Sequence, residues 1–256
     1  DYDSRYGTRG KHRRHGVFAC RFLRTSHRPL RLRKEEAGRE DCTVLYRVRR
    51  FLRDGADAIH RIVFQLAGEA LTGSVILYAV YGGLMAALFE ETGRYIAMRF
   101  LVKPLDFPNA FMYGAGHGGV EAMLLCGVAS ISNVASAVMI NSGTMSAQLA
   151  TLDAEKAADT AAALSALWTT PSLTFFAGGV ERIIAVVLHL SLSILVFQSI
   201  RKKAPMELVR AYLFHFVIDS LSVLLSAVAS VWVVELVTAL VTGGAVLMAK
   251  YACMEE

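Results

Sequence analysis

Ten ionisable residues lie inside otherwise apolar stretches of this 256-residue chain. They are Glu90, Glu91, Arg94, His117, Glu121, Glu181, Arg182, His189, His215 and Asp219. Residues four or seven positions apart share one face of a helix, and four pairs keep that spacing: Glu90 with Arg94, His117 with Glu121, His215 with Asp219, and Arg182 with His189. Carboxylates can act as a general base, histidines can carry a proton, and arginines can neutralise charge. The spacing therefore predicts a catalytic site that activates water, built by polar stripes on four helices.

The segments that must position these residues are strongly apolar. Hydrophobic residues make up 54% of the chain and charged residues 19%, with a mean hydropathy of +0.43, whereas a soluble domain carries about 25% charge. A membrane span needs roughly 20 apolar residues, and residues 70–89 hold no Lys, Arg, Asp or Glu. The sequence predicts an all-α fold, a polytopic bundle of about five or six transmembrane helices with a polar site inside the membrane.

The apolar runs and the breaks between them predict where the helices lie. The spans are residues 70–102, 109–125, 171–200, 206–229 and 230–250, and residues 128–149, which are richer in Ser, Asn and Gly, form either a further span or a partly re-entrant segment. Lys103-Pro104 ends the first span, since proline cannot continue a helix. Residues 151–170 carry their charges on one side, which predicts an amphipathic helix outside the membrane.

Two basic turns predict the orientation, because cytoplasmic loops are enriched in Lys and Arg. One turn holds Arg201-Lys202-Lys203, and the other lies near Arg99 and Lys103. If residues 109–125 and 128–149 cross the membrane separately, these turns fall on opposite sides. Either the second of these segments does not cross, or one basic turn lies outside.

Ion pairs that only hold helices together are the alternative explanation for the buried charges. Inserting one ionisable residue into a membrane helix costs about 2.5–3.5 kcal/mol. Four polar stripes that include the adjacent Glu90 and Glu91 and three histidines favour a functional role over pairing alone. Glycines flank His117 within residues 113–121, and Gly178-Gly179 precedes Glu181. Such small residues let helices approach closely in lipid.

The first 53 residues differ in composition from the rest of the chain. They hold 16 of the 27 Lys and Arg and 6 of the 22 Asp and Glu, a balance of +10, whereas the remaining residues balance to −5. No helical or strand period is evident there. Residues 1–61 are interpreted as a basic head that is a solvated, poorly ordered tail, a polybasic arm attracted to anionic lipid, or a non-native segment. Residues 62–252 are predicted to form the membrane domain.

Motifs in the membrane domain resemble the YhfC family of intramembrane metalloproteases. They are Phe89-Glu90-Glu91-Thr-Gly-Arg94-Tyr95, Gly114-Ala-Gly-His117-Gly-Gly-Val-Glu121, Gly179-Val-Glu181-Arg182, His189-Leu-Ser-Leu-Ser193 and His215-Phe-Val-Ile-Asp219. That family is similar in layout to the CAAX-processing and PrsW-type membrane proteases, which combine Glu-Glu-x-x-x-Arg, aromatic-x-x-x-His and His-x-x-x-Asn/Asp helices. Tyr113-x-x-x-His117 and the His215 motif fit this pattern, whereas the first motif has one residue fewer before its arginine.

The resemblance implies an intramembrane endopeptidase that hydrolyses membrane or membrane-anchored substrates. Glu90 or Glu91 would take a proton from a water molecule. Adjacent helical residues point about 100° apart, so only one of them should be the base, and Glu91 is favoured as the residue that faces His117. The other roles are distributed over His117 and His215 (water positioning or oxyanion stabilisation), Asp219 or Glu121 (orienting a histidine) and Arg94 (holding the carboxylates ionised).

Two chemistries remain open for this protease. In the metal-dependent version, His117, His215 and a carboxylate (Glu91, Glu121 or Asp219) would bind zinc and leave one position for water. In the glutamic version no metal is needed. The chain has no His-Glu-x-x-His zinc signature, which slightly favours the metal-free version.

The competing functional interpretation is a proton-coupled membrane carrier or a membrane binding scaffold. Proton relays also use buried carboxylates and histidines, but the internal repeats common in carriers are not evident. Under the protease interpretation the expected partners are membrane lipid and a membrane protein or peptide substrate, and no nucleic acid. The expected location is the bacterial plasma membrane, and no oligomeric state is predicted.

Overall fold

The computed structural model describes the backbone of residues 39–254 and the side chains of residues 55–254. The chain divides into two units, Asp1–Cys42 and Thr43–Glu256, and the description below concerns the second. The interpretations of the basic head fall mainly on residues outside the described part, so its boundary at residue 61 stays a prediction. Residues from Arg39 onward are helical, and their apolar and charged residues follow the helical period, so the statement that no such period is evident is wrong for residues 39–53.

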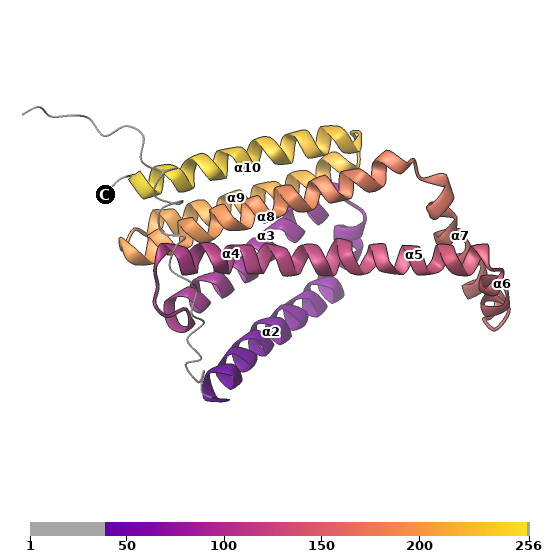
Figure 1. Ribbon diagram of the computed structural model, residues 1–256, viewed down its shortest axis with the longest axis horizontal. Coiled ribbons are helices and arrows are strands. Elements are labelled where there is room, and N and C mark those ends of the chain that lie inside the picture. The colour runs from indigo at the N-terminus through magenta and orange to yellow at the C-terminus, as the bar shows by residue number, and fades with distance from the viewer. Residues whose placement is uncertain (1–38, 255–256) are drawn as a thin grey trace, which may run out of the picture. The chain divides into compact units, whose positions relative to one another are not determined.

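Every element in the described part of the chain is a helix (Figure 1). The elements are α2 (Arg39–Thr72), α3 (Val75–Ile96), the π-helix η1 (Ala97–Leu101), α4 (Phe107–Ala122), the π-helix η2 (Met123–Gly127), α5 (Val128–Asn141), α6 (Thr144–Leu149), α7 (Ala154–Thr169), α8 (Ser172–Arg201), α9 (Pro205–Ser226) and α10 (Val231–Met254). Five stretches within them are long and apolar enough to span a membrane: Val75–Leu101, Phe107–Asn141, Ser172–Arg201, Pro205–Ser226 and Val231–Met254. The prediction of an all-α polytopic bundle is confirmed, with five candidate spans.

The helix boundaries follow local sequence signals. The Ser74 side chain accepts a hydrogen bond from the backbone N–H of Leu77 at the start of α3, and Asp106 accepts one from Asn109 at the start of α4. Asp153 begins α7 in the same way by accepting from Lys156. Such N-caps satisfy backbone donors that have no partner inside the helix. The amphipathic helix predicted for residues 151–170 is present as α7.

The second span corrects the sequence-based division of this region. Residues 109–125 and 128–149 were predicted as two segments, yet α4, η2 and α5 follow one another without a break from Phe107 to Asn141. A π-turn accommodates one extra residue in a helix without ending it. The re-entrant alternative for residues 128–149 is therefore wrong over the helical part of that range. The chain turns only after Asn141, where Gly143 has the positive φ of 79° that glycine adopts readily.

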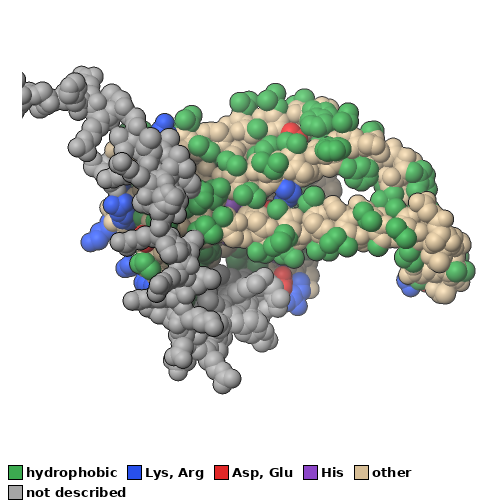
Figure 2. All heavy atoms as spheres, in the orientation of Figure 1, with side chains coloured by type: hydrophobic (Ala, Val, Ile, Leu, Met, Phe, Trp, Pro, Cys, Tyr) green, Lys and Arg blue, Asp and Glu red, His purple; other side chains and the backbone are tan. Residues whose placement is uncertain are grey.

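This continuous span removes the conflict between the two basic turns. With one crossing between residues 107 and 141, the turn after η1 and the turn between α8 and α9 lie at the same end of the bundle. In Figure 1 both turns lie at the left, and Figure 2 shows Lys and Arg side chains gathered at that end. We call it the basic end, and it carries Arg99, Lys103, Arg201, Lys202, Lys203, Arg210 and Lys250.

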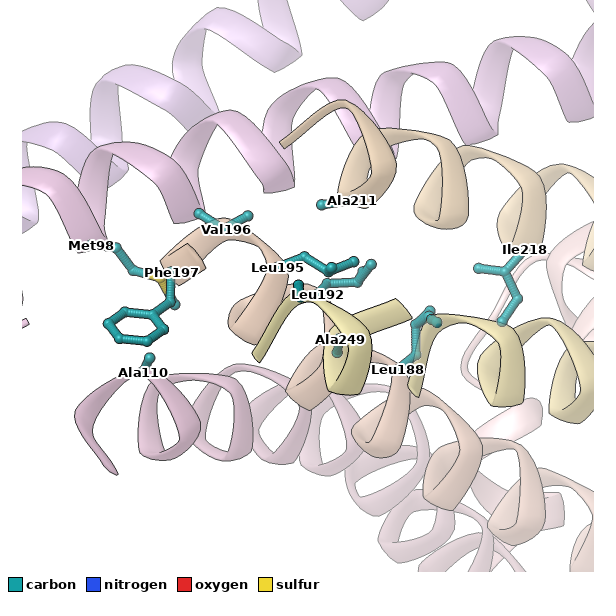
Figure 3. Packing of buried hydrophobic residues seen from close by; sticks show 12 residues of the cluster. Met98, Ala110, Leu188, Leu192, Leu195, Val196, Phe197, Ala211, Ile218 and Ala249 are labelled. Atoms are coloured by element: carbon teal, nitrogen blue, oxygen red, sulfur yellow. The ribbon is translucent and has the colours of Figure 1, made fainter. Parts of the chain in front are cut away.

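The hydrophobic core fills the half of the bundle next to the basic end. Met98 from η1, Ala110 from α4 and Phe197 from α8 meet there, as Figure 3 shows, and none of the three side chains is more than 1% exposed. Leu192, Leu195 and Val196 continue this core along α8. Helices in lipid associate through close packing and not through water exclusion, and this part of the molecule is a tightly packed layer of buried side chains.

Candidate functional site

Four helices, α3, α4, α8 and α9, bring the polar stripes together next to the hydrophobic core. Glycines permit the close approach of α4 to α8: a Cβ atom on Gly114 would lie 2.9 Å from the His189 carbonyl oxygen, and one on Gly118 would lie 3.0 Å from the Cα of Val186. Gly116 and Gly119 have no atom in the corresponding space. Two of the four glycines around His117 therefore have the predicted packing role, and Gly178-Gly179 does not show it.

Glu90 and His117 form the exposed pair of the site. His117 Nε2 lies 3.1 Å from Glu90 Oε2, and about a third of the Glu90 side chain is exposed. The same carboxylate oxygen is 3.8 Å from His215 Nε2. The prediction that Glu91 faces His117 is wrong, because Glu90 occupies that position.

Glu91, about 100° further round α3, lies in a fully buried ion pair. Its Oε2 atom is 3.2 Å from Arg94 Nε, and neither side chain has any exposed surface. Its Oε1 atom accepts a hydrogen bond from His215 Nδ1 at 2.7 Å. The four-residue spacing predicted a pair between Arg94 and Glu90. Arg94 instead pairs with Glu91, three residues before it. A buried carboxylate on Nδ1 fixes the orientation of the ring and leaves Nε2 of His215 facing the cavity.

Arg94 also determines the tautomer of His189. Its guanidinium donates hydrogen bonds to the His189 carbonyl oxygen at 2.7 Å, to Ser193 Oγ at 2.8 Å and to His189 Nδ1 at 2.8 Å. Arginine has donors only, so Nδ1 of His189 must be an acceptor without a proton. A neutral ring then carries its proton on Nε2, which donates to Glu121 Oε2 at 2.6 Å.

Glu121 joins α4 to two positions on α8. Besides the bond from His189, its Oε1 atom accepts a hydrogen bond from Arg182 at 2.8 Å. Arg182 also contacts Glu181, the most exposed charged residue of the site at 48%. The seven-residue spacing of Arg182 and His189 thus presents both side chains to one carboxylate, as the shared helix face predicted.

Asp219 lies one turn after His215 on α9. Its Oδ2 atom is 3.5 Å from His215 Nε2, and 40% of the side chain is exposed. The two exposed carboxylates, Asp219 and Glu90, therefore flank the same ring nitrogen. The prediction that His215 and Asp219 share one face of their helix is confirmed.

These side chains line a cavity of about 90 Å³. Its walls comprise Glu90, Glu121, Glu181, Arg182, Ile184, Ala185, Leu188, His189, His215, Ile218, Asp219, Ser222 and Thr238. One water molecule occupies roughly 30 Å³ in the liquid, so the cavity has room for the reacting water and a little more. Glu91 and Arg94 do not line it, because they lie beneath it.

Four residues bring metal-ligating atoms together: Glu90, His117, Glu121 and His189 each offer one such atom, and these atoms all lie within 4.8 Å of one another. Imidazole nitrogens and carboxylate oxygens are the donors that catalytic zinc sites use, so the residues fit such an ion. The set shares His117 and Glu121 with the predicted ligands, whereas His215, Glu91 and Asp219 lie outside it. His189 is the least suited member, because a metal-bound histidine donates its other ring N–H and Arg94 occupies that position as a donor.

Sequence reasoning missed two buried polar residues beside the site. Glu235 has only 6% of its surface exposed, and its Oε2 atom has no hydrogen-bond partner among the described residues. Thr238, one turn later on α10, lines the cavity. Their three-residue spacing on one face of α10 was the available signal.

Comparisons with known proteins agree with this architecture. A sequence model of the YhfC intramembrane metalloprotease family matches residues 56–238. The chain is 40% identical over 139 residues to the uncharacterized membrane protein YhfC of Bacillus subtilis (strain 168), an alignment covering 54% of this chain and 53% of the relative. The chain thus spans about half the length of the curated relative it matches. No solved structure matches the chain. On the strength of the family match over most of its helical bundle, this integral membrane protein belongs to the YhfC intramembrane metalloprotease family.

Proposed function

We propose that this protein is an endopeptidase that hydrolyses peptide bonds of membrane-embedded or membrane-anchored polypeptides in the bacterial plasma membrane. The observation that carries the proposal is Glu90, which lines a small cavity within a bundle of apolar helices and contacts His117 at 3.1 Å. Family membership supports hydrolysis as the reaction class, and the bacterial relative supports the location.

Glu90 is the general base of the proposed reaction. Its carboxylate takes a proton from a water molecule in the cavity while the water oxygen attacks the substrate carbonyl carbon. When the C–N bond breaks, the proton held by Glu90 passes to the leaving nitrogen, so the protons balance. Its 3.1 Å contact with His117 orients the carboxylate, and an oriented base avoids rearrangement at the moment of reaction.

His215 serves the oxyanion side of the cavity. Its Nδ1 atom is fixed by the buried Glu91, and its Nε2 atom faces both Glu90 and Asp219. With a proton on Nε2, the ring donates a hydrogen bond to the carbonyl oxygen as negative charge develops there. Glu91 and Arg94 are positioning residues, because Glu91 holds this ring, Arg94 holds Glu91, and neither lines the cavity.

In the metal-dependent version of this chemistry, Glu90, His117 and Glu121 would hold the ion, with His189 orienting Glu121 through Nε2–H, and the ion would take over from Glu90 the activation of the water molecule. Three protein ligands and one open position are the usual arrangement of a catalytic zinc. A bound zinc ion would lower the pKa of a water molecule and polarise the carbonyl group.

Hydrolysis is tested with the purified full chain in lipid nanodiscs and a set of fluorogenic transmembrane peptides. We expect cleavage by the wild type and a loss of at least about 100-fold in kcat for Glu90→Gln, the scale of a missing general base. Glu155→Gln makes the same substitution on exposed α7 and should retain wild-type activity. Equal activity of Glu90→Gln and Glu155→Gln would contradict the assignment of the base.

The ligand set is tested by elemental analysis of the purified protein. We expect Glu121→Gln to hold less than half of the zinc that the wild type holds, and Asp219→Asn to hold an unchanged amount. Activity of the wild type should fall on chelation and return with zinc. A metal-free wild type that remains active would instead support the glutamic chemistry.

A further inference from the structure

A second cavity lies between α5, α7 and the start of α8, and none of the catalytic groups lines it. We call it the distal cavity. Its volume is about 310 Å³, against about 90 Å³ for the catalytic cavity that Glu90 lines. Pockets that bind small molecules begin at about 300 Å³. The distal cavity therefore has room for a ligand much larger than water, such as a short stretch of polypeptide.

The walls of the distal cavity are polar but uncharged. No Asp, Glu, Lys, Arg or His is among the described residues that line it. Five lining side chains bear a hydroxyl or amide group and make no hydrogen bond to any described residue: Ser132, Asn133, Ser136, Thr160 and Thr170. Hydroxyl and amide groups both donate and accept hydrogen bonds. The distal cavity therefore suits a neutral ligand that carries donors and acceptors of its own.

Two helices lead from the distal cavity to the catalytic cavity. α4 packs along α8, whereas α5, the continuation of α4 beyond η2, has its main contacts with α6 and α7. The two helices therefore separate beyond η2 (Figure 1). Glu121 of α4 and Arg182 of α8 line the catalytic cavity, where the helices are close. Asn133 of α5 and Phe175 of α8 line the distal cavity, where they have separated.

The α8 residues between the two cavities share one helix face. Phe175, Gly178, Gly179 and Arg182 are spaced by three or four positions, which is the helical period. A Cβ atom on either glycine would have nothing within 4 Å. These glycines therefore do not close a helix contact, and they leave the surface of α8 between the two cavities uncovered.

One polypeptide can reach both cavities. The rise of α8 between Phe175 and Arg182 is about 10 Å, and the rise of the α4–α5 span between Glu121 and Ser132 is about 16 Å. An extended chain covers about 3.3 Å per residue. A chain that leaves the catalytic cavity therefore reaches the distal cavity within about three to five residues.

Hydrolysis inside a membrane creates a need for such a site. In a substrate helix every interior carbonyl oxygen accepts a hydrogen bond from the same helix, so the bond to be cut must lie in an unwound segment. Unwinding frees backbone N–H and C=O groups, which are costly to leave unpaired at membrane depth. The five unpartnered side chains of the distal cavity can satisfy them.

From the neutral hydrogen-bonding walls and the uncovered glycine face, we infer that the distal cavity binds the substrate polypeptide as an uncharged, unwound segment about three to five residues from the scissile bond. The inference rests on the proposed function, and it narrows the substrate class. Substrates carry Ser, Thr, Gly, Ala or apolar residues in this segment and no Lys, Arg, Asp or Glu, because the cavity offers a charge no partner.

Binding of labelled transmembrane peptides tests the inference without any need for cleavage. The full chain is placed in lipid nanodiscs in the Glu90→Gln background, and the Kd is read by fluorescence anisotropy. Asn133→Leu removes an amide group from the distal cavity and keeps a side chain of similar size. Gly179→Leu places a side chain on the uncovered face of α8, where it meets no described atom within 4 Å of its Cβ.

Two matched controls carry the same substitutions elsewhere. Asn141→Leu changes an exposed residue at the end of α5. Gly243→Leu changes an exposed glycine of α10 whose Cβ would also have nothing within 4 Å. Neither residue lines either cavity. Melting temperatures of all four variants show whether each one retains the parent fold.

We expect Asn133→Leu and Gly179→Leu to raise the Kd by about 3- to 10-fold, the range for one lost hydrogen bond or slightly more. Both controls should stay within about twofold of the parent. A lysine moved through the peptide one position at a time should weaken binding about 10-fold over a window of about three positions. That window should lie about three to five residues from the bond that the wild type cuts.

The inference is overturned if the parent binds no peptide, or if folded Asn133→Leu and Gly179→Leu bind as the controls do. A lysine that weakens binding equally at every position would also overturn it. Peptides that bind in the expected way but are not cut by the wild type would refute the proposed function and leave the binding site standing. Peptides that are cut with an unchanged KM in Asn133→Leu and Gly179→Leu would support the proposed function and refute the binding site.

Discussion

Arg94 provides the sharpest test of how the site is held together. Its fully buried guanidinium pairs with Glu91 and donates three hydrogen bonds to α8. Removing one member of a buried ion pair leaves the other charge without compensation, which costs about 3–5 kcal/mol. We expect Arg94→Met, which keeps an unbranched apolar stem and removes the charged group, to lower the free energy of unfolding by this amount.

A double variant separates the charge from the hydrogen bonds. In Glu91→Gln the amide oxygen can still accept the hydrogen bond from His215, but the side chain carries no charge. Combined with Arg94→Met, it removes the uncompensated charge and leaves only the acceptors on α8 without their donor, at about 1–3 kcal/mol. The double variant should therefore regain about 2 kcal/mol relative to Arg94→Met alone.

Unfolding in mixed detergent micelles, followed by tryptophan fluorescence, measures these differences. Arg61→Met is the matched control, because Arg61 is exposed and makes one side-chain hydrogen bond, to the Asp57 carbonyl oxygen; its cost should stay below about 0.5 kcal/mol. The reasoning is refuted if Arg94→Met is no less stable than this control. It is also refuted if the double variant is no more stable than Arg94→Met alone.

Two further predictions concern helix packing. Gly114→Ala would place a Cβ 2.9 Å from backbone atoms of α8 and should cost about 1–3 kcal/mol, seen as a lower melting temperature and reduced peptide cleavage. Gly116→Ala has nothing within 4 Å of its Cβ and should melt at or above the wild-type temperature, so equal melting of the two variants would contradict the close approach. Tyr212→Phe removes the 2.6 Å hydrogen bond to Thr92 and should cost about 1 kcal/mol in the micelle assay; an unchanged stability would show that this bond does not hold α3 to α9.

The fold and most of the site follow from patterns that depend on one helix at a time. Apolar runs identified the spans, and four- and seven-residue spacings identified residues that now line one cavity, such as His215 and Asp219. These signals are local, because the helical period alone decides which side chains share a face. The all-helical architecture was predictable for the same reason.

The errors concern the relation between helices. Which of Glu90 and Glu91 meets His117 depends on how α3 is rotated against α4, and no spacing within α3 encodes that rotation. The break expected near residue 127 did not occur, because a π-turn carries the helix past it and leaves no marker such as proline. That His189 is a partner of Arg94 could not be predicted, because the contact depends on how α3 packs against α8. Neither segment's own sequence indicates that packing.

The length of the second span has a consequence for where the protein meets the lipid. Thirty-five helical residues extend about 52 Å, whereas a helix tilted by 40° crosses a ~30 Å hydrocarbon layer with about 26. Hydrophobic mismatch of this size exceeds what tilting absorbs, so the last turns of α5 must emerge from the hydrocarbon layer at the end opposite to the basic end. The Ser and Asn residues of α5 lie where the helix would leave the lipid. Because α4 and α5 form one continuous span, the depth of the cavity that Glu121 of α4 lines should shift relative to the headgroups with lipid chain length.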